Sequence, residues 1–244
     1  MQKPLLIIGN KNYSSWSLRA WLLLKAFNID FNEQLIELFH PSATPILDEH
    51  APTGKVPVLV YGENDEKVMV WDTLAIAIHA NDYLTDLDIW TGLSKSDIDN
   101  SNRINSAYCQ SIVAEMHSGL MGIRSEMPMN IRATARIKPS TACLTDIARI
   151  EHIFTECLTN RSADSYLFGH FTAADAFFAP VVLRLQTYAK ASGIILKPST
   201  EQYCQTMLNN PHVQAWQQAA LQEDYVIESD EAGEILSVEG ILAE

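Results

Sequence analysis

The stretch that decides the fold is Leu5-Leu6-Ile7-Ile8-Gly9-Asn10-Lys11-Asn12-Tyr13-Ser14-Ser15-Trp16-Ser17-Leu18-Arg19. Its first four residues form an apolar run with the length of a short buried strand. A turn rich in hydroxyl side chains follows, and a helix is predicted over about 15–27. Serine side chains at a helix N-terminus cap unpaired N–H groups. The same N–H groups and the helix dipole favour an anion, so this turn is a cap or an anion site.

The first 83 residues alternate between strand and helix patterns. The expected strands are Leu5–Ile8, Phe31–Leu38, Val56–Tyr61 and Lys67–Trp71, and the expected helices cover about 15–27 and 72–83. Gly62-Glu63-Asn64-Asp65 has the composition of a turn and joins the last two strands into a hairpin. The order β-α-β, hairpin, α predicts a thioredoxin-like α/β domain over residues 1–83.

The pattern becomes helical after a linker at residues 84–95. Residues 96–244 are expected to form an all-helical C-terminal domain that ends in a solvated acidic tail. Its predicted helices cover about 96–125, 140–160, 172–190, 199–209 and 211–222. Thr172 and Asp175 have the spacing of a capping box at the start of the third of these helices.

Composition and charge narrow the function classes. The chain has 244 residues, is 47% hydrophobic and carries a formal net charge of −13. This charge repels phosphates and anionic lipids, so we expect no nucleic acid and no membrane partner. No apolar run reaches the length of a membrane-spanning helix.

The cysteine pattern predicts neither a zinc site nor a dithiol redox motif. Cys109, Cys143, Cys157 and Cys204 are widely spaced, and no two of them form a C-x-x-C pair. We therefore expect buried, reduced thiols in a cytoplasmic protein.

A second motif is Gly54-Lys55-Val56-Pro57, in which a proline opens an otherwise apolar strand. Proline removes a donor from the strand ladder, which an edge strand with a trans bond tolerates. General rates favour that interpretation. A cis Val56–Pro57 bond is the alternative, and it would aim the Val56 backbone groups at a peptide-like ligand. A phosphate loop is excluded because neither its first glycine nor its final Ser or Thr is present.

A third motif is Asp72-Thr73, which opens a helix directly after a strand. Both residues serve as helix caps in many proteins. The functional alternative is that Asp72 accepts a hydrogen bond from a ligand ammonium, while the Thr73 hydroxyl and N–H bind the ligand's carboxylate.

Taken in order, these motifs resemble the glutathione transferase superfamily along nearly the whole chain. The matching residues are Ser14, Ser15, Ser17 and Arg19, then Val56-Pro57, then Asp72-Thr73, then Gly169, Phe171, Thr172 and Asp175. The segment Asn12–Arg19 is most similar to a bacterial group related to the zeta class. That class has a cysteine where this chain has Trp16, so the segment lacks the thiol that cysteine-based glutathione chemistry needs.

The resemblance implies a homodimeric, cytoplasmic glutathione transferase that acts in detoxification. Glutathione is the implied co-substrate, a small electrophile is the second substrate, and no metal is required. Ser14 or Ser15 is implied to donate its hydroxyl to the glutathione sulfur, with Tyr13 as a third candidate. Two alternatives stay open: a glutathione-dependent isomerase similar to maleylacetoacetate isomerase, and a non-catalytic binding or regulatory protein.

The remaining site residues follow from the same resemblance. Lys55, Val56, Pro57, Asp72 and Thr73 are expected to bind glutathione. Trp16, Met116, His117 and Arg124 are candidates for the electrophile's pocket, although a core tryptophan and a surface histidine or arginine are the simpler interpretations. Arg19 is expected to form an ion pair within the first domain.

Overall fold

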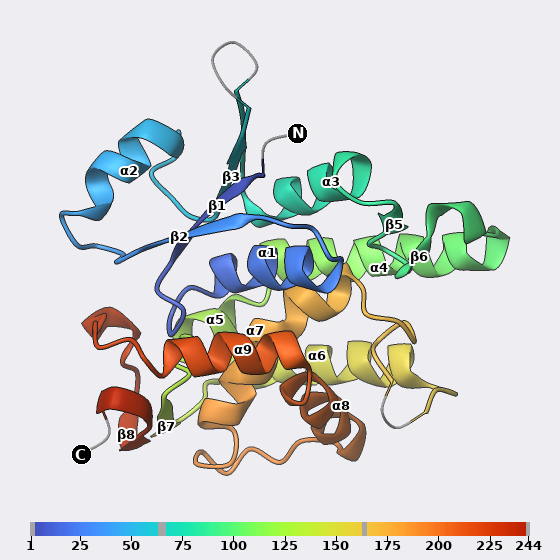
Figure 1. Cartoon of the computed structure of the whole chain (residues 1–244). Helices are drawn as coiled ribbons and strands as arrows, with labels where there is room; N and C mark the ends of the chain where they lie inside the picture. Colours follow the sequence, from blue (N-terminus) through green and yellow to red (C-terminus); the bar gives the residue numbers. More distant parts are fainter. Residues whose placement is uncertain (1–2, 63–66, 163–164, 243–244) are drawn as a thin grey trace.

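The computed structural model describes residues 3–62, 67–162 and 165–242 (Figure 1). Its N-terminal part contains a four-stranded sheet in the order β2-β1-β3-β4. The strands are β1 (Leu5–Gly9), β2 (Asn32–Ile36), β3 (Val58–Tyr61) and β4 (Val68–Trp71). β1 runs parallel to β2 and antiparallel to β3, and β3 and β4 form the expected hairpin. The thioredoxin-like arrangement is thus confirmed, while the turn expected at Gly62–Asp65 lies mostly outside the described residues.

Both faces of the sheet are covered, which explains why β1 is apolar at every position. Leu6 and Ile8 pack with α1 (Ser15–Ala26) and α3 (Thr73–Tyr83) in the main hydrophobic core. Ile7 points the other way and packs in a smaller cluster with residues of α2 (Ala43–His50). Sequence patterning did not predict α2, because Ala43 is its one fully buried residue.

The C-terminal part is mainly helical, as predicted. Its helices are α4 (Asn100–Ser118), α5 (Met121–Glu126), α6 (Thr141–Leu158), α7 (Ala173–Tyr188), α8 (Pro198–Leu208) and α9 (Pro211–Ala220). Residues 84–95, expected to be a linker, include the short strands β5 (Leu87–Asp88) and β6 (Leu93–Ser94) and lead into η2 (Lys95–Asp97). The helix expected over 96–125 is interrupted at Leu120, whose backbone is left-handed with φ 58°. The domain boundaries themselves stay predictions.

The C-terminal half differs in two details from the sequence-based expectation. It is not entirely helical, because β7 (Ala133–Arg136) pairs with β8 (Glu234–Val238) across about a hundred residues of sequence. The last segment, which also contains η3 (Glu228–Asp230) and η4 (Gly240–Leu242), is not simply a solvated tail. The carboxylate of Glu223 accepts hydrogen bonds from the N–H groups of Lys11 (2.6 Å) and Asn12 (3.1 Å), which holds the segment against the serine turn.

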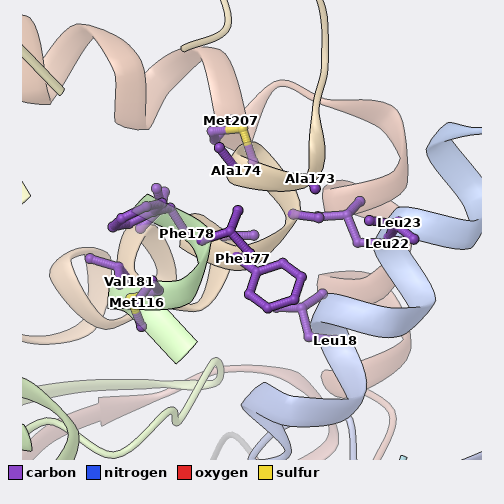
Figure 2. Close-up of a cluster of buried hydrophobic side chains, with 14 of the residues drawn as sticks. Leu18, Leu22, Leu23, Met116, Ala173, Ala174, Phe177, Phe178, Val181 and Met207 are labelled. Atoms are coloured by element: carbon purple, nitrogen blue, oxygen red, sulfur yellow. The ribbon is translucent and has the colours of Figure 1, made fainter. Parts of the chain in front are cut away.

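The two halves share one core, built where α1 meets α7. Leu18 and Leu22 of α1 lie beside Phe177 of α7, and Leu23 belongs to the same cluster (Figure 2). All four side chains are at most 1% exposed. α1 therefore packs on the sheet with one side and on the helical half with the other, which places its N-terminal serines at the junction (Figure 1).

The cysteines lie in the interior of the fold. All four cysteines are buried, and none forms a disulfide within the described part of the chain. None of the helices in residues 3–62, 67–162 and 165–242 combines the length and apolarity that crossing a membrane requires.

The capping box of α7 predicts a measurable stability loss. Burial raises the pKa of Asp175 to about 6, against the hydrogen bonds that it accepts from the Thr172 N–H (2.8 Å) and hydroxyl (3.0 Å). Thr172→Ala removes one donor to this carboxylate and should lower the free energy of unfolding by about 1–3 kcal/mol in urea denaturation at pH 8.

The matched control is Thr145→Ala, an exposed threonine of α6, which should change stability by less than about 0.5 kcal/mol. Without the donor, the pKa of Asp175 in the folded state rises further. The Thr172→Ala deficit should therefore shrink as the pH falls from 8 to about 6, because Asp175 takes up its proton at a higher pH in the variant, and it should change little at lower pH. Equal losses in the two variants would contradict this role.

Candidate active site

Two adjoining cavities open beside the N-terminus of α1. The first, of about 420 Å³, is lined by Trp16, Thr53, Lys55, Val56, Pro57, Trp71, Asp72 and Thr73. The second, of about 390 Å³, lies between the two halves of the chain and is lined by Tyr13, Ser14, Ser15, Trp16, Leu38, Phe39, Gly54, Lys55, Val56, Arg124, Pro128, Met129, Arg184 and Asp230. They share Trp16, Lys55 and Val56, so the fold gathers most of the predicted site residues around one place.

The two serines differ in how their hydroxyls are bonded. Ser14 caps α1: its oxygen accepts from the Ser17 N–H (3.3 Å), and its hydroxyl donates to Ser17 Oγ (2.8 Å). Ser15 is the first residue of the helix, and its Oγ accepts from the Arg184 guanidinium (3.2 Å). The proton of Ser14 is therefore engaged inside the turn, whereas the bond at Ser15 leaves its proton for another acceptor.

The Tyr13 hydroxyl is already hydrogen-bonded to two other side chains. Its hydroxyl donates to Glu231 and accepts from Arg132. Burial and the hydrogen bond to Glu231 raise the pKa of Tyr13 to about 12. This phenol joins the serine turn to the C-terminal segment, so its geometry does not support a role as donor to a ligand sulfur.

The loop before β3 brings backbone groups to the cavity wall. The Val56–Pro57 peptide bond is cis, which was the less favoured alternative on general rates. Lys55, Val56 and Pro57 all line the first cavity. Val56 therefore lies in the cavity wall, two residues before β3 begins.

Asp72 and Thr73 both act as structural residues at the start of α3. Asp72 Oδ1 accepts from the N–H groups of Leu74 (2.8 Å) and Ala75 (3.4 Å). Its side chain remains 42% exposed, so a carboxylate oxygen is still accessible from the cavity. The Thr73 hydroxyl donates to the Trp16 carbonyl (3.1 Å), which ties α3 to α1 and uses the proton expected for a ligand carboxylate.

The four candidate pocket residues fall into two groups. The Trp16 ring lies between the guanidinium groups of Arg19 and Arg124, 4.7 and 5.2 Å from its centroid. His117 packs edge-on against Trp16 with the ring centroids 5.2 Å apart, and its Nε2 is 3.4 Å from Asp72 Oδ2. Burial lowers the pKa of His117, which favours the neutral ring. Neither His117 nor Met116 lines either cavity, whereas Trp16 and Arg124 do. His117 reaches the site only through its contact with Trp16, and Met116 is fully buried in the core (Figure 2).

The expected ion pair of Arg19 is wrong. The side chain is completely buried, and its three guanidinium nitrogens have no hydrogen-bond partner in the described ranges. It packs instead between the rings of Trp16 and Phe177, at 4.7 and 5.6 Å. The core that α1 forms with α7 surrounds Arg19 with rings rather than carboxylates, and burial lowers its pKa well below the ordinary value.

Sequence reasoning missed two charged residues at this site, Arg184 and Asp230. A lone arginine inside the apolar run of α7 was the available signal for Arg184. Asp230 gave no such signal, because it lies in the segment that was interpreted as a solvated tail.

The comparisons with known proteins agree with this architecture. Residues 13–82 match the family model of the glutathione S-transferase N-terminal domain. No curated protein sequence matches the chain significantly.

Several solved structures share the fold along nearly the whole chain. A glutathione transferase homolog from Burkholderia gl BGR1, with bound glutathione, has a TM-score of 0.61 at 17% identity and covers 90% of this chain and 98% of its own. Glutathione transferase Omega 2S from Trametes versicolor has a TM-score of 0.65 at 14% identity, and the match covers 93% of this chain and 98% of the Trametes chain. Maleylacetoacetate isomerase from Anaeromyxobacter dehalogenans 2CP-1, with bound dicarboxyethyl glutathione and citrate, has a TM-score of 0.56 at 17% identity. The match covers 88% of this chain and 92% of the isomerase.

The chain therefore has the glutathione transferase fold, a thioredoxin-like domain followed by a helical region. The match of residues 13–82 and the shared fold together support the glutathione transferase superfamily. The bacterial zeta-like group is not distinguished, because omega-class structures and the isomerase are similar to this chain at nearly the same identity.

The bonds of Tyr13 predict that its hydroxyl stabilises the junction. Tyr13→Phe leaves Arg132 and Glu231 with one partner fewer and should lower the free energy of unfolding by about 1–3 kcal/mol in urea denaturation. Tyr83→Phe, at a side chain that is 70% exposed, should have an effect below about 0.5 kcal/mol. If the two variants unfold at the same urea concentration as the unsubstituted protein, the proposed role of the Tyr13 hydroxyl is wrong.

Proposed function

We propose that this protein is a glutathione transferase in which Ser15 activates the glutathione thiol. The observation that carries the proposal is the bonding of Ser15. Its hydroxyl lies at the first turn of α1, in the wall of a cavity, and its oxygen already accepts a hydrogen bond from Arg184. The hydroxyl therefore has a proton to donate to an anion at a helix end, where the helix dipole also favours negative charge.

Glutathione would lie along the first cavity with its sulfur at the second. The Val56 backbone pairs with the tripeptide as a short added strand, beside Pro57. Asp72 accepts from the γ-glutamyl ammonium, and the Thr73 N–H at the start of α3 donates to the adjacent carboxylate. Lys55 offsets the glycine carboxylate. The Burkholderia structure with bound glutathione supports this ligand class for the shared fold.

The free energy needed to ionise the thiol is of the size that a serine hydroxyl at a helix end can supply. A free thiol has a pKa of about 8.5, and lowering it by two units takes roughly 2.7 kcal/mol of preference for the anion. A hydrogen bond to a charged group contributes about 1.5–3 kcal/mol. A helix N-terminus adds roughly 0.3–1 kcal/mol. A serine hydroxyl and a helix end therefore supply free energies of the magnitude that this shift requires.

The chemistry is a nucleophilic attack by this thiolate. Its sulfur donates an electron pair to an electrophilic carbon, a thioether bond forms, and the leaving group departs with its bonding pair. The thiol proton goes to water. The second cavity would hold the electrophile against Trp16 and Arg124, with His117 behind the indole. The homodimer, the cytoplasmic location and the detoxification role stay predictions.

Isomerisation is the second candidate, favoured by the shared fold with the Anaeromyxobacter maleylacetoacetate isomerase. It needs the same thiolate but returns it unchanged. Product analysis separates the two reactions, because a conjugate accumulates in one and glutathione is recovered in the other.

Single serine substitutions test the proposal. Ultraviolet absorbance of the bound thiolate near neutral pH should be lost in Ser15→Ala, and conjugation of a chlorodinitrobenzene should fall by about 100-fold, the equivalent of two pKa units. Ser14→Ala is the matched neighbour, and it should keep the thiolate signal because its proton is used by Ser17.

Other results with these serine variants would change the assignment. Loss of the signal in Ser14→Ala alone would transfer the role to Ser14. An unchanged signal in both variants and in the double variant would refute serine activation. Glutathione binding without any thiolate would favour the non-catalytic alternative.

A further inference from the structure

Arg184 is a buried cation in the wall of the second cavity. Its side chain is 5% exposed, in the middle of the apolar helix α7. Nε donates to the Met127 carbonyl (2.7 Å) and Nη2 donates to Ser15 Oγ (3.2 Å). Nη1 has no hydrogen-bond partner, and no carboxylate in the described parts of the chain lies within ion-pair distance. Such a group is costly to bury unless an anion joins it.

Other charged side chains lie near Arg184. The chain is acidic overall, yet Arg19, Arg124 and Arg184 gather at the junction of its two halves. Arg124 and Arg184 lower the pKa of Arg19, and Arg124 also lowers the pKa of Arg184. Asp230 lines the same cavity and acts on Arg184 from beyond ion-pair distance. Burial lowers the pKa of Arg184 to about 10, so the guanidinium remains charged at neutral pH.

The other two arginines have other roles. Arg124 donates to the carbonyls of Gly119 (2.9 Å), Met116 and His117 and so covers the C-terminal end of α4. Arg19 is enclosed between aromatic rings and lines neither cavity. Arg184 is the guanidinium that contacts Ser15.

The hydrogen bond from Arg184 determines the direction in which the Ser15 hydroxyl can donate its proton. A guanidinium has no acceptor, so a serine oxygen that accepts from it must turn its own proton elsewhere. The positive charge also polarises that hydroxyl and lies one hydroxyl group away from any anion that Ser15 contacts. A hydrogen bond with a charged partner is stronger than a neutral one.

We infer that Arg184 is a positioning residue that holds Ser15 as the hydrogen-bond donor to the glutathione sulfur and supplies the positive charge that favours the thiolate. This inference rests on the proposed function. It makes thiol activation in the first domain depend on a side chain of the helical half. A transferase that relied on its serine and helix end alone would not need α7 for this step.

The test is the pKa of the bound glutathione thiol, measured from thiolate absorbance across pH. Arg184→Met removes the charge while keeping an unbranched apolar side chain. The thiol pKa should rise by about one to two units, and kcat/KM near neutral pH should fall about 10- to 100-fold. Both should recover in part in Arg184→Lys. The loss in kcat/KM should also disappear at high pH, where the thiol ionises without help.

Two controls separate this role from a structural one. S-methylglutathione has no thiol to ionise, so its dissociation constant, measured by calorimetry, should change by less than about threefold in Arg184→Met. Arg103→Met, at an exposed arginine of α4, should leave thiol pKa and activity unchanged. In a Ser15→Ala background, Arg184→Met should shift the thiol pKa much less than in the unsubstituted protein, because the two residues act as one unit.

The failures are distinguishable. An unsubstituted protein that binds glutathione without forming thiolate refutes the proposed function itself. Thiolate in the unsubstituted protein, with the same thiol pKa in Arg184→Met and intact S-methylglutathione binding, overturns the role of Arg184 alone. If Arg184→Met loses S-methylglutathione binding, Arg184→Lys and Arg184→Gln decide: equal thiol pKa values in these two variants contradict a role for the charge.

Discussion

The packing of α1 between the sheet and α7 is the constraint on which the rest of the structure depends. Leu18 and Leu22 are completely buried, with β1 behind the helix and Phe177 in front of it. A helix enclosed on both sides cannot rotate or slide without opening a cavity in the core, which typically costs several kcal/mol for each large side chain lost. This rigidity fixes the position of the serine turn at the N-terminal end of α1.

The fixed position of α1 gives each polar group at its N-terminal end a different environment. The Ser14 hydroxyl caps the helix, the Tyr13 phenol is bound by Arg132 and Glu231, and Ser15 faces a cavity. Arg19 and Arg184 are buried at this junction and form no ion pair in the described part of the chain, which is unusual for a folded protein. The anion site that we propose would account for this, because a bound thiolate would supply the missing negative charge.

Local patterns predicted much of this fold. The strands β1, β3 and β4 and the helices α1, α3 and α7 follow from apolar runs, periodicity and caps that each lie within about twenty residues. The β7–β8 pair and the fixed C-terminal segment depend on partners about a hundred or more residues away, and the two strands are only four and five residues long. The same limit applies to the site: the Ser14, Val56 and Asp72 motifs were readable, whereas the contact between Ser15 and Arg184 spans 169 residues.

A crystal structure of the protein with glutathione tests the central claim most directly. We predict that the tripeptide lies along the Val56–Pro57 loop with its γ-glutamyl end at Asp72. Its sulfur should lie within hydrogen-bond distance of Ser15 Oγ, with the bond from Arg184 intact. Glutathione bound elsewhere, or with its sulfur away from the N-terminus of α1, would contradict the account.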